Sequence, residues 1–283
     1  MQANNTRLPP GGQSQGPNPP GIRNDGKSGG GIRSISLGKT NDKVFELVTK
    51  NDLERAAIID VGAGEGHFSQ KLGNHIREKY AVAPATILKA CDLFPGQFKY
   101  RDITCDPVNI NQSLPYADQT FDIACSIEVI EHIENQYAYA RELYRICKEN
   151  GRVFITTPNT LNINSRIKYF HSGFLDLFGP MPISRSDPVH VSGHIHPVTF
   201  YYLSYILYKT GFKKITLHTD RFKRSGLALI LFFYPLIKLL SCAYLRHSRR
   251  KHPEIHRENW EILSRINTME MLAARTVIVE ATK

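Results

Sequence analysis

The sequence is short of acidic residues and cysteines, and it has only one long apolar run. Its 283 residues hold 26 Asp and Glu against 36 Lys and Arg, which gives a formal net charge of +10. Such a balance suits an anionic membrane surface or nucleic acid as a partner. The five cysteines lack C-x-x-C spacing, which argues against a zinc site and against a disulfide framework. We therefore expect reduced, buried thiols and a cytoplasmic location.

Apolar side chains are nearly absent from residues 1–33, where Pro and Gly cluster instead. Ordering such a segment would cost conformational entropy without burying apolar surface. The segment also has no apolar core of the kind found in secretory signals. We predict a disordered Gly/Pro-rich arm over residues 1–33 and a single folded domain over residues 34–283.

Apolar runs alternate with amphipathic segments from residue 41 onward. Helical spacing covers residues 41–53, 66–80, 135–150 and 198–212, with Gly151 expected to end the third helix. Strands are predicted at residues 56–62, 85–92, 98–104, 121–129, 152–158, 213–219 and 275–282, and residues 160–196 are expected to be irregular. The alternation predicts parallel pairing and a doubly wound α/β, Rossmann-like sheet of seven strands.

The turn after the first predicted strand is rich in glycine. It reads Asp60-Val-Gly62-Ala63-Gly64-Glu-Gly66 and leads into a helix. Glycines at this spacing let the backbone turn tightly and approach a ligand at a helix N-terminus. The dinucleotide fingerprint G-x-G-x-x-G would need glycine at His67, so NAD is not favoured. An acid followed by G-x-G-x-G resembles motif I of class I S-adenosylmethionine-dependent methyltransferases.

Further segments extend this resemblance over about residues 55–160. Asp92 ends the second strand, where a carboxylate can accept both hydroxyls of a ribose, and Leu93 follows it. The stretch NINQSLPYADQTFDIACSIEVIEH matches the family, with Asn109 in place of the usual aspartate that faces the adenine amino group. An amide oxygen can still accept that bond. The resemblance implies S-adenosylmethionine as cofactor, with Ser126 and Glu128 at its methionine end. The implied binding residues are Asp60, Gly62, Ala63, Gly64, Gly66, Asp92, Leu93, Asn109, Ile110, Ser126 and Glu128.

Residues 156–212 resemble a type-11-like branch of bacterial methyltransferases. The fifth strand ends in T-P-N, a loop at residues 160–196 would cover the acceptor, and G-H-x-x-P opens the next helix. Members of that branch often act on cell-surface glycan or glycolipid precursors. A hydroxyl acceptor must lose a proton, for which histidine is suited near neutral pH. The candidate bases are His132, His171, His194 and His196, with His194 and His196 preferred and no metal expected.

Three alternative hypotheses about function rest on the same residues. The cluster Glu128, Glu131, His132 and His194 also resembles the metal-binding set of small-RNA 3′-end 2′-O-methyltransferases. An E-H pair also occurs in the O-methyltransferases of ubiquinone biosynthesis, whose substrate is dissolved in the membrane. A non-catalytic methyltransferase fold would bind a partner only, which the intact glycines and Asp92 argue against.

The long apolar run covers residues 227–245, between two predicted strands of one sheet. A single membrane crossing would put these strands on opposite sides, so we expect no span. We predict a helical insertion over residues 221–272 that docks on one leaflet or on a partner. Basic residues on both sides of the run favour an anionic membrane at the inner face over nucleic acid, with a homodimer as the alternative. The acceptor would be a small or lipid-linked molecule.

Overall fold

One mixed sheet of seven strands organises the computed structural model, which describes residues 32, 38–181, 183 and 193–283. The strands are β1 (Ile58–Val61), β2 (Leu88–Asp92), β3 (Cys105–Pro107), β4 (Phe121–Ile127), β5 (Cys147–Pro158), β6 (Lys214–Thr219) and β7 (Thr276–Thr282). Their order is β3-β2-β1-β4-β5-β7-β6, and β7 runs antiparallel to both of its neighbours. The prediction of a doubly wound α/β sheet of seven strands is confirmed.

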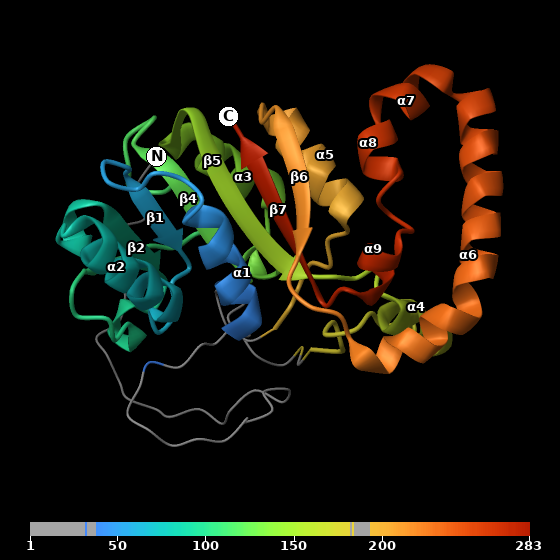
Figure 1. Cartoon of the computed structure of the whole chain (residues 1–283), viewed down its shortest axis with the longest axis horizontal. Helices are drawn as coiled ribbons and strands as arrows, with labels where there is room; N and C mark the ends of the chain where they lie inside the picture. The colour runs from blue at the N-terminus through green and yellow to red at the C-terminus, as the bar shows by residue number, and fades with distance from the viewer. Residues whose placement is uncertain (1–31, 33–37, 182, 184–192) are drawn as a thin grey trace, which may run out of the picture. The chain divides into compact units, whose positions relative to one another are not determined.

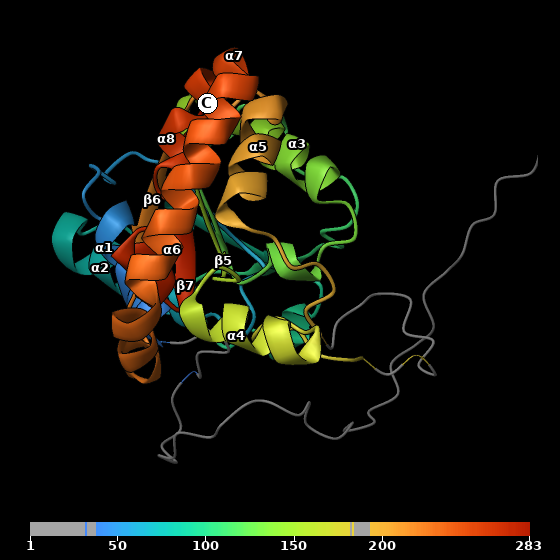
Figure 2. The same ribbon diagram turned by 90° about the vertical axis from the view of Figure 1, so that its right-hand side faces the viewer.

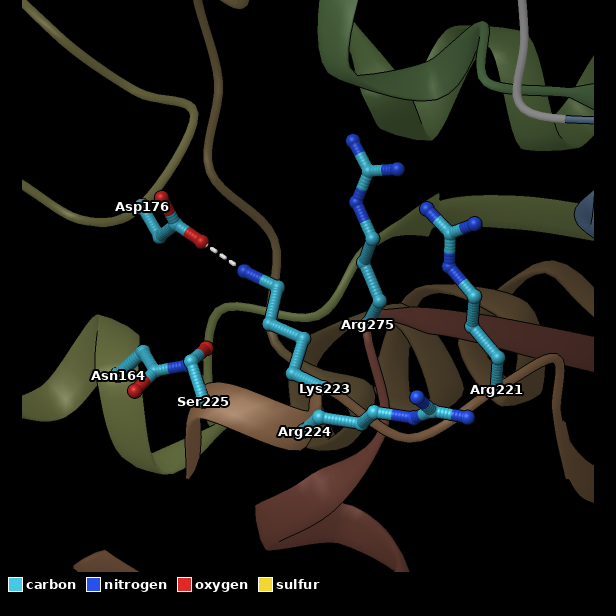
Figure 3. Close-up of a pocket in the computed structure, with 7 residues that line it drawn as sticks. All are labelled: Asn164, Asp176, Arg221, Lys223, Arg224, Ser225 and Arg275. Atoms are coloured by element: carbon cyan, nitrogen blue, oxygen red, sulfur yellow. Dashed lines mark hydrogen bonds and ion pairs between the residues drawn. The ribbon is translucent and has the colours of Figure 1, made fainter. Parts of the chain in front are cut away.

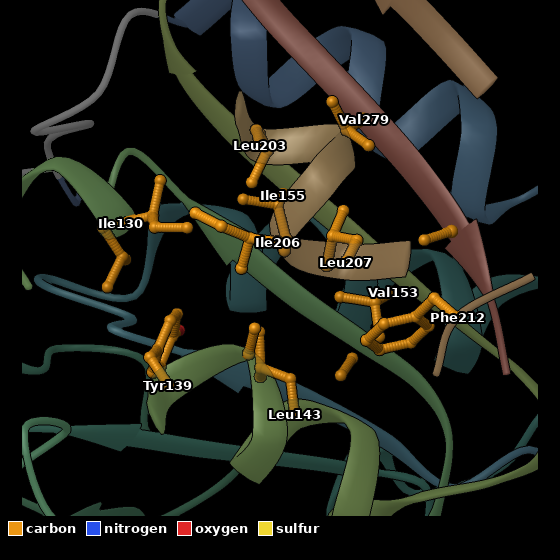
Figure 4. Close-up of a cluster of buried hydrophobic side chains, with 14 of the residues drawn as sticks. Ile130, Tyr139, Leu143, Val153, Ile155, Leu203, Ile206, Leu207, Phe212 and Val279 are labelled. Carbon is orange, nitrogen blue, oxygen red and sulfur yellow. The ribbon is translucent and has the colours of Figure 1, made fainter. Parts of the chain in front are cut away.

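Helices pack on both faces of the sheet (Figure 1). One face is covered by α1 (Gly38–Val48) and α2 (His67–Tyr80), and the other by α3 (Gln136–Ile146) and α5 (Phe200–Thr210). The helix α4 (Ile163–Ser172) packs against the insertion described below, and short 3-10 turns lie at η1 (Pro84–Thr86), η2 (Pro95–Gln97) and η3 (Ile130–His132). On β5, Val153 and Ile155 join the cluster of α3 and α5, whereas Phe154 joins that of α1 and α2. This alternation is the period of a strand buried on both faces. Figure 4 shows the first cluster, in which Leu203 and Leu207 of α5 face the sheet.

A helical insertion separates β6 from β7, as the sequence predicted. It comprises α6 (Arg224–Lys251), α7 (Pro253–Glu258), α8 (Trp260–Leu263) and α9 (Met269–Ala273). Figures 1 and 2 show α6 as a long helix at the side of the sheet, with α7 to α9 leading back to β7. The fully buried residues of α6 lie near its start: Ile230 packs with Ile163, Leu272 and Ala273, and Gly226 lies against Ile163.

Several local predictions were wrong. Residues 98–104 form no strand, because the third strand lies at Cys105–Pro107. Gly151 does not end the third helix, since α3 stops at Ile146 and Gly151 lies within β5. A Cβ on Gly151 would lie 2.8 Å from the Lys148 carbonyl oxygen, so close backbone approach explains the glycine. The first helix ends at Val48 rather than residue 53, and the segment 160–196 contains α4.

Other predictions have mixed outcomes. All five cysteines are free, but Cys242 is exposed on α6 rather than buried. The predicted disorder of residues 1–33 lies outside the described residues, apart from Ile32.

Candidate active site

The glycine turn lies at the carboxyl edge of the sheet, between β1 and α2. Gly62, Gly64 and Gly66 all have left-handed backbone angles, with φ of 76°, 55° and 87°. The amides of Gly62 and Ala63 both donate to the Cys91 carbonyl oxygen, at 2.8 and 3.1 Å, which fastens the turn to β2. Crevices outside the carboxyl ends of parallel strands are where ligands bind in open α/β sheets.

Asp60, the acid before the turn, is almost completely buried. Its Oδ2 accepts a 2.6 Å hydrogen bond from the Ser69 hydroxyl of α2. Burial raises the pKa of Asp60 to about 7, and the Ser69 bond opposes part of that rise. The carboxyl group therefore joins β1 to α2 within the protein, and Ser69 is its described partner.

Asp92 lies beside the turn at the end of β2. Its Oδ2 accepts a 2.8 Å bond from the Gly64 amide, and its Oδ1 accepts a 2.8 Å bond from the Phe94 amide. A carboxylate oxygen has more than one lone pair, so both atoms can still accept ribose hydroxyls. Leu93 follows, partly buried. The structure thus places the glycine turn and Asp92 together, as the resemblance implied.

Asn109 and Ile110 follow β3 along the same edge of the sheet. The Asn109 Oδ1 accepts a 3.1 Å bond from the Asn111 amide and keeps a second lone pair. Ile110 is partly buried against the core. Both positions suit an adenine contact next to Asp92.

Ser126 and Glu128, predicted for the methionine end of the cofactor, have different surroundings. Ser126 is buried, and its hydroxyl bonds the Tyr139 hydroxyl of α3 at 2.8 Å. Its side chain is therefore hydrogen-bonded within the core and does not line the crevice. Glu128 directly follows β4 with a left-handed φ of 56° and accepts a 3.1 Å bond from the Thr156 hydroxyl. Burial raises its pKa to about 7, while Thr156 and Arg275 oppose the rise.

A cluster of three ligand-type side chains forms just beyond Glu128. One side-chain atom from each of Glu131, His132 and His194 lies within 4.8 Å of the others. Glu131 is fully buried, and neither of its carboxylate oxygens has a partner in hydrogen-bond geometry among the described residues, although the nearby Thr157 hydroxyl lowers its pKa slightly. A buried carboxylate without a partner is costly. A divalent cation with oxygen and imidazole ligands would remove that cost.

The electrostatics differ between the members of the cluster. Burial raises the pKa of Glu131 well above its usual value, and the nearby Glu128 adds to the rise, so the metal-free carboxyl keeps a proton that a bound cation would displace. Burial lowers the pKa of His132, and burial together with His132 lowers that of His194 to about 4. Both imidazoles are therefore neutral at pH 7, the state that accepts a proton or binds a metal.

The loop that carries His194 is tied to η3. The amides of Ile195 and His196 donate to the Glu131 carbonyl oxygen at 2.9 and 3.1 Å, and the Gly193 carbonyl lies 2.9 Å from the His132 Nδ1. These bonds hold the His194 ring 5.0 Å from that of His132. Only the interpretation based on the small-RNA methyltransferases had grouped these two residues, because residues 132 and 194 are distant in the sequence and meet through the loop.

The other candidate bases do not join the cluster. The His196 side chain is exposed, and its Nδ1 lies 2.8 Å from the Ile133 carbonyl oxygen. His171 is exposed in the last turn of α4. Of the four histidines, His132 and His194 are the two that the structure brings together.

Two residues near the site were missed by the sequence reading. Val129 packs over Gly62, and Phe98 packs over Gly66, where an added Cβ would lie 2.7 Å from the ring. Both side chains are apolar, so their residue types gave no sign that they lie at a binding site.

The fold and the glycine turn define a class I methyltransferase. A family model described as a methyltransferase domain matches residues 37–217, and the chain belongs to that family. It is a methyltransferase whose methyl donor is S-adenosylmethionine. The glycine turn and Asp92 offer the backbone amides and carboxylate oxygens that such a donor requires.

Similarity to individual proteins is more limited. The mitochondrial ubiquinone biosynthesis O-methyltransferase of Dictyostelium discoideum is 33% identical over 165 residues, which are 53% of this chain and 47% of that protein. The ubiquinone biosynthesis O-methyltransferase of Pseudomonas putida is 28% identical over 107 residues, 36% of this chain and 44% of that protein. The match thus spans about half the length of these curated relatives.

Among solved structures, a SAM-dependent methyltransferase from Archaeoglobus fulgidus aligns with a TM-score of 0.50 at 15% identity, covering 86% of this chain and 94% of that one. A SAM-dependent methyltransferase from Thermotoga maritima, described as a possible histamine N-methyltransferase, also has a TM-score of 0.50, at 12% identity, covering 86% of this chain and 89% of that one. These likenesses bear on the fold alone.

Proposed function

We propose that this enzyme transfers a methyl group from S-adenosylmethionine to a hydroxyl of a lipid-borne acceptor at a membrane surface. The observation that carries the proposal is the cluster of Glu131, His132 and His194 beside the donor crevice. The cofactor supplies an activated methyl group on its sulfonium. The chain's own task is to align that group with the acceptor oxygen and to remove the hydroxyl proton.

The cluster can promote loss of the acceptor's hydroxyl proton in one of two ways. A neutral His194 or His132 can accept it directly, as the sequence favoured. A divalent cation held by Glu131, His132 and His194 would instead lower the pKa of a bound hydroxyl. The unpartnered oxygens of Glu131 support the cation, and we propose that the cluster holds one.

For the acceptor, we favour a phenolic hydroxyl on a molecule with an apolar tail. This proposal is supported by the ubiquinone biosynthesis O-methyltransferases among the curated relatives, whose name implies such an acceptor. A sugar hydroxyl of a glycolipid precursor is the second candidate, supported by the T-P-N strand end and the G-H-x-x-P loop, which lies against the Glu131 cluster. Both acceptors would be presented at a membrane.

Membrane contact is proposed for α6. It is the one helix among the described residues that is long and apolar enough to cross a bilayer, and only 11% of its apolar window is buried. Its exposed side chains include Leu231, Phe232 and Leu239. Because β6 and β7 on either side of the insertion pair in one sheet, we propose that α6 lies in one leaflet without crossing it. The basic end of α6, with Arg249, Arg250 and Lys251, would face anionic head groups of the cytoplasmic inner face.

The test is a methyl-transfer assay with the purified full chain and labelled donor. We would compare a catechol with a prenyl tail, a glycolipid extract and a short RNA, each with anionic vesicles present. Label should enter the catechol, and Gly64→Arg should abolish the transfer by blocking the donor turn. Label in the glycolipid alone would move the acceptor to the second candidate, and label in the RNA 3′ end would overturn the proposal.

A further inference from the structure

Two arginines face each other where the pairing of β6 and β7 continues beyond the strands. The register that sets Thr219 opposite Val277 resumes as a bridge between Phe222 and Ala274. Arg221 is therefore directly opposite Arg275, and the Arg275 amide donates to the Arg221 carbonyl oxygen at 3.0 Å. Figure 3 shows the two guanidinium groups side by side and pointing the same way.

This arrangement is unfavourable without a ligand. Like charges directly opposite on an antiparallel pair destabilise it. Arg275 is partly buried, and its pKa is lowered by burial first and by the Arg221 charge second, while Glu128, Asp220 and Asp176 oppose the lowering. Within residues 38–181 and 193–283, neither guanidinium has an ion pair to offset the repulsion.

The acidic groups nearby already have partners. Asp176 pairs with Lys223, and Asp220 accepts bonds from the Thr40 hydroxyl and from the amides of Arg221 and Thr276. Glu128 accepts its bond from Thr156. The donors to Asp220 and Glu128 are neutral, so these carboxylates, together with Asp176, offset part of the charge of Arg275. None of the three makes an ion pair with either arginine within the described residues, which leaves the guanidinium N–H donors for a group from outside the chain.

The surroundings of the pair form a cavity. It has a volume of about 560 Å³, and besides the cationic side chains its lining holds Asn164, Ser225 and the Asp176 carboxylate, which is paired with Lys223 (Figure 3). Two parallel guanidinium groups match the oxygens of a carboxylate or a phosphate, which they can bind in a bidentate manner. The ligand class is therefore an oxyanion.

The cavity lies at the same edge of the sheet as the donor site, where β4 and β5 end. Arg275 comes just before β7 and its carbonyl accepts a bond from the Asn159 amide, which follows β5. Glu128 at the end of β4 is close enough to affect the pKa of Arg275. An acceptor anchored at the arginines would extend along this edge toward Glu128 and the cluster of Glu131, His132 and His194.

We propose that Arg221 and Arg275 form a subsite for a carboxylate or phosphate carried by the acceptor, so that the enzyme selects acidic acceptors. The link to the acceptor rests on the proposed function, whereas the oxyanion site itself does not. A phosphate of a lipid head group has the same chemistry, and the experiment separates the two sources.

The first arm measures the site without catalysis. Inorganic phosphate at low millimolar concentration, with chloride at equal ionic strength as reference, should raise the melting temperature of the full chain. In Arg221→Gln and Arg275→Gln the phosphate affinity should fall at least tenfold, while both variants melt at or above the wild-type temperature without phosphate, because the repulsion is gone. Arg275→Lys keeps the charge and should retain part of the affinity. Arg141→Gln, an exposed arginine of α3, is the matched control. Equal phosphate affinity in all variants would overturn the subsite.

The second arm assigns the oxyanion. A hydroxylated acceptor that carries a carboxylate should have a KM at least tenfold lower than the corresponding amide. In Arg275→Gln that difference in KM should disappear. S-adenosylhomocysteine binding and sedimentation with phosphatidylglycerol vesicles should stay unchanged in this variant. If Arg275→Gln loses vesicle binding and the two acceptors have equal KM, the oxyanion belongs to a lipid and the acceptor assignment is wrong. If phosphate binds at the arginines but no acceptor is methylated, the proposed function fails while the oxyanion site stands.

Discussion

Gly62 lies directly against Val129: a Cβ added to Gly62 would come within 2.5 Å of the Val129 Cγ2 atom. The same glycine has a φ of 76°, which L side chains rarely adopt. The first turn of the donor site is thus restricted twice, by backbone angle and by the side chain that covers it.

Replacing Gly62 should therefore damage both stability and donor binding. We expect Gly62→Ala to lower the free energy of unfolding by about 1–3 kcal/mol and to abolish detectable S-adenosylhomocysteine binding in calorimetry. Adding Val129→Ala should recover only part of the stability, since it removes the clash but not the backbone strain. Gly96→Ala, where a Cβ meets nothing within 4 Å, is the control and should change neither property.

Asp92 should contribute to donor affinity through both carboxylate oxygens. Asp92→Ala removes the ribose acceptors and also releases the Gly64 amide. We expect S-adenosylhomocysteine to bind at least tenfold more weakly, a loss of about 1.4 kcal/mol or more. Asp52→Ala removes an exposed carboxylate before β1, at the opposite edge, and should leave affinity unchanged. Equal binding by wild type and Asp92→Ala would remove Asp92 from the site.

The sequence predicted the donor half of the site better than the acceptor half. Asp92 and the glycines follow buried apolar strands, so their place at the carboxyl edge follows from strand order. The third strand was misplaced because the strand at Cys105–Pro107 is short and lies at the edge of the sheet. None of its residues is fully buried, so its sequence shows no alternation of apolar and polar residues. The signals for α4 were present: Asn162 accepts a bond from the Ser165 amide, and Gly173 ends the helix with a φ of 72°.

The acceptor side depends on contacts between distant segments. His194 reaches Glu131 only because the loop amides at residues 195 and 196 bond the Glu131 carbonyl. Arg221 faces Arg275 only because the β6–β7 register continues past the strands. Neither relation has a local spacing rule. The first was suggested only by the resemblance to the small-RNA methyltransferases, and the second was not suggested by the sequence.

The cluster of Glu131, His132 and His194 should bind one divalent cation. We expect the chelator-treated full chain to bind Mn²⁺, measured by electron paramagnetic resonance of the free ion, and His194→Ala or Glu131→Gln to weaken binding at least tenfold. His171→Ala, an exposed histidine of α4, is the control. Methyl transfer should be lost with EDTA and restored by Mn²⁺. Full activity in EDTA and no Mn²⁺ binding would instead favour a histidine base without metal.

Asp60 should make the donor-free protein less stable as pH rises. Burial raises its pKa from 3.8 to about 7, so between these values the folded state keeps a proton that the unfolded state has lost. Its contribution to stability is complete below pH 3.8 and is lost as pH rises through 7, at up to about 1.4 kcal/mol per pH unit. In urea unfolding, Asp60→Asn should show a flatter decline between pH 5 and 7 than wild type or Asp52→Asn. An unchanged slope would mean that Asp60 is ionised in the folded protein.

The apolar side of α6 should hold the enzyme to one leaflet. Leu231, Phe232 and Leu239 are 83, 77 and 68% exposed, whereas Phe233 packs against the body of the protein, so the outward three are the ones to change. Burying each is worth about 1.5–3 kcal/mol, so replacing all three with Ser should release the protein from phosphatidylglycerol vesicles while S-adenosylhomocysteine binding persists. Tyr137→Ser, an exposed aromatic of α3, is the control for a general loss of surface apolarity.

High salt should weaken wild-type sedimentation without ending it, because the basic end of α6 supplies only part of the attraction. A wild type that stays in solution, together with a dimer that the triple variant splits in analytical ultracentrifugation, would make α6 a protein interface.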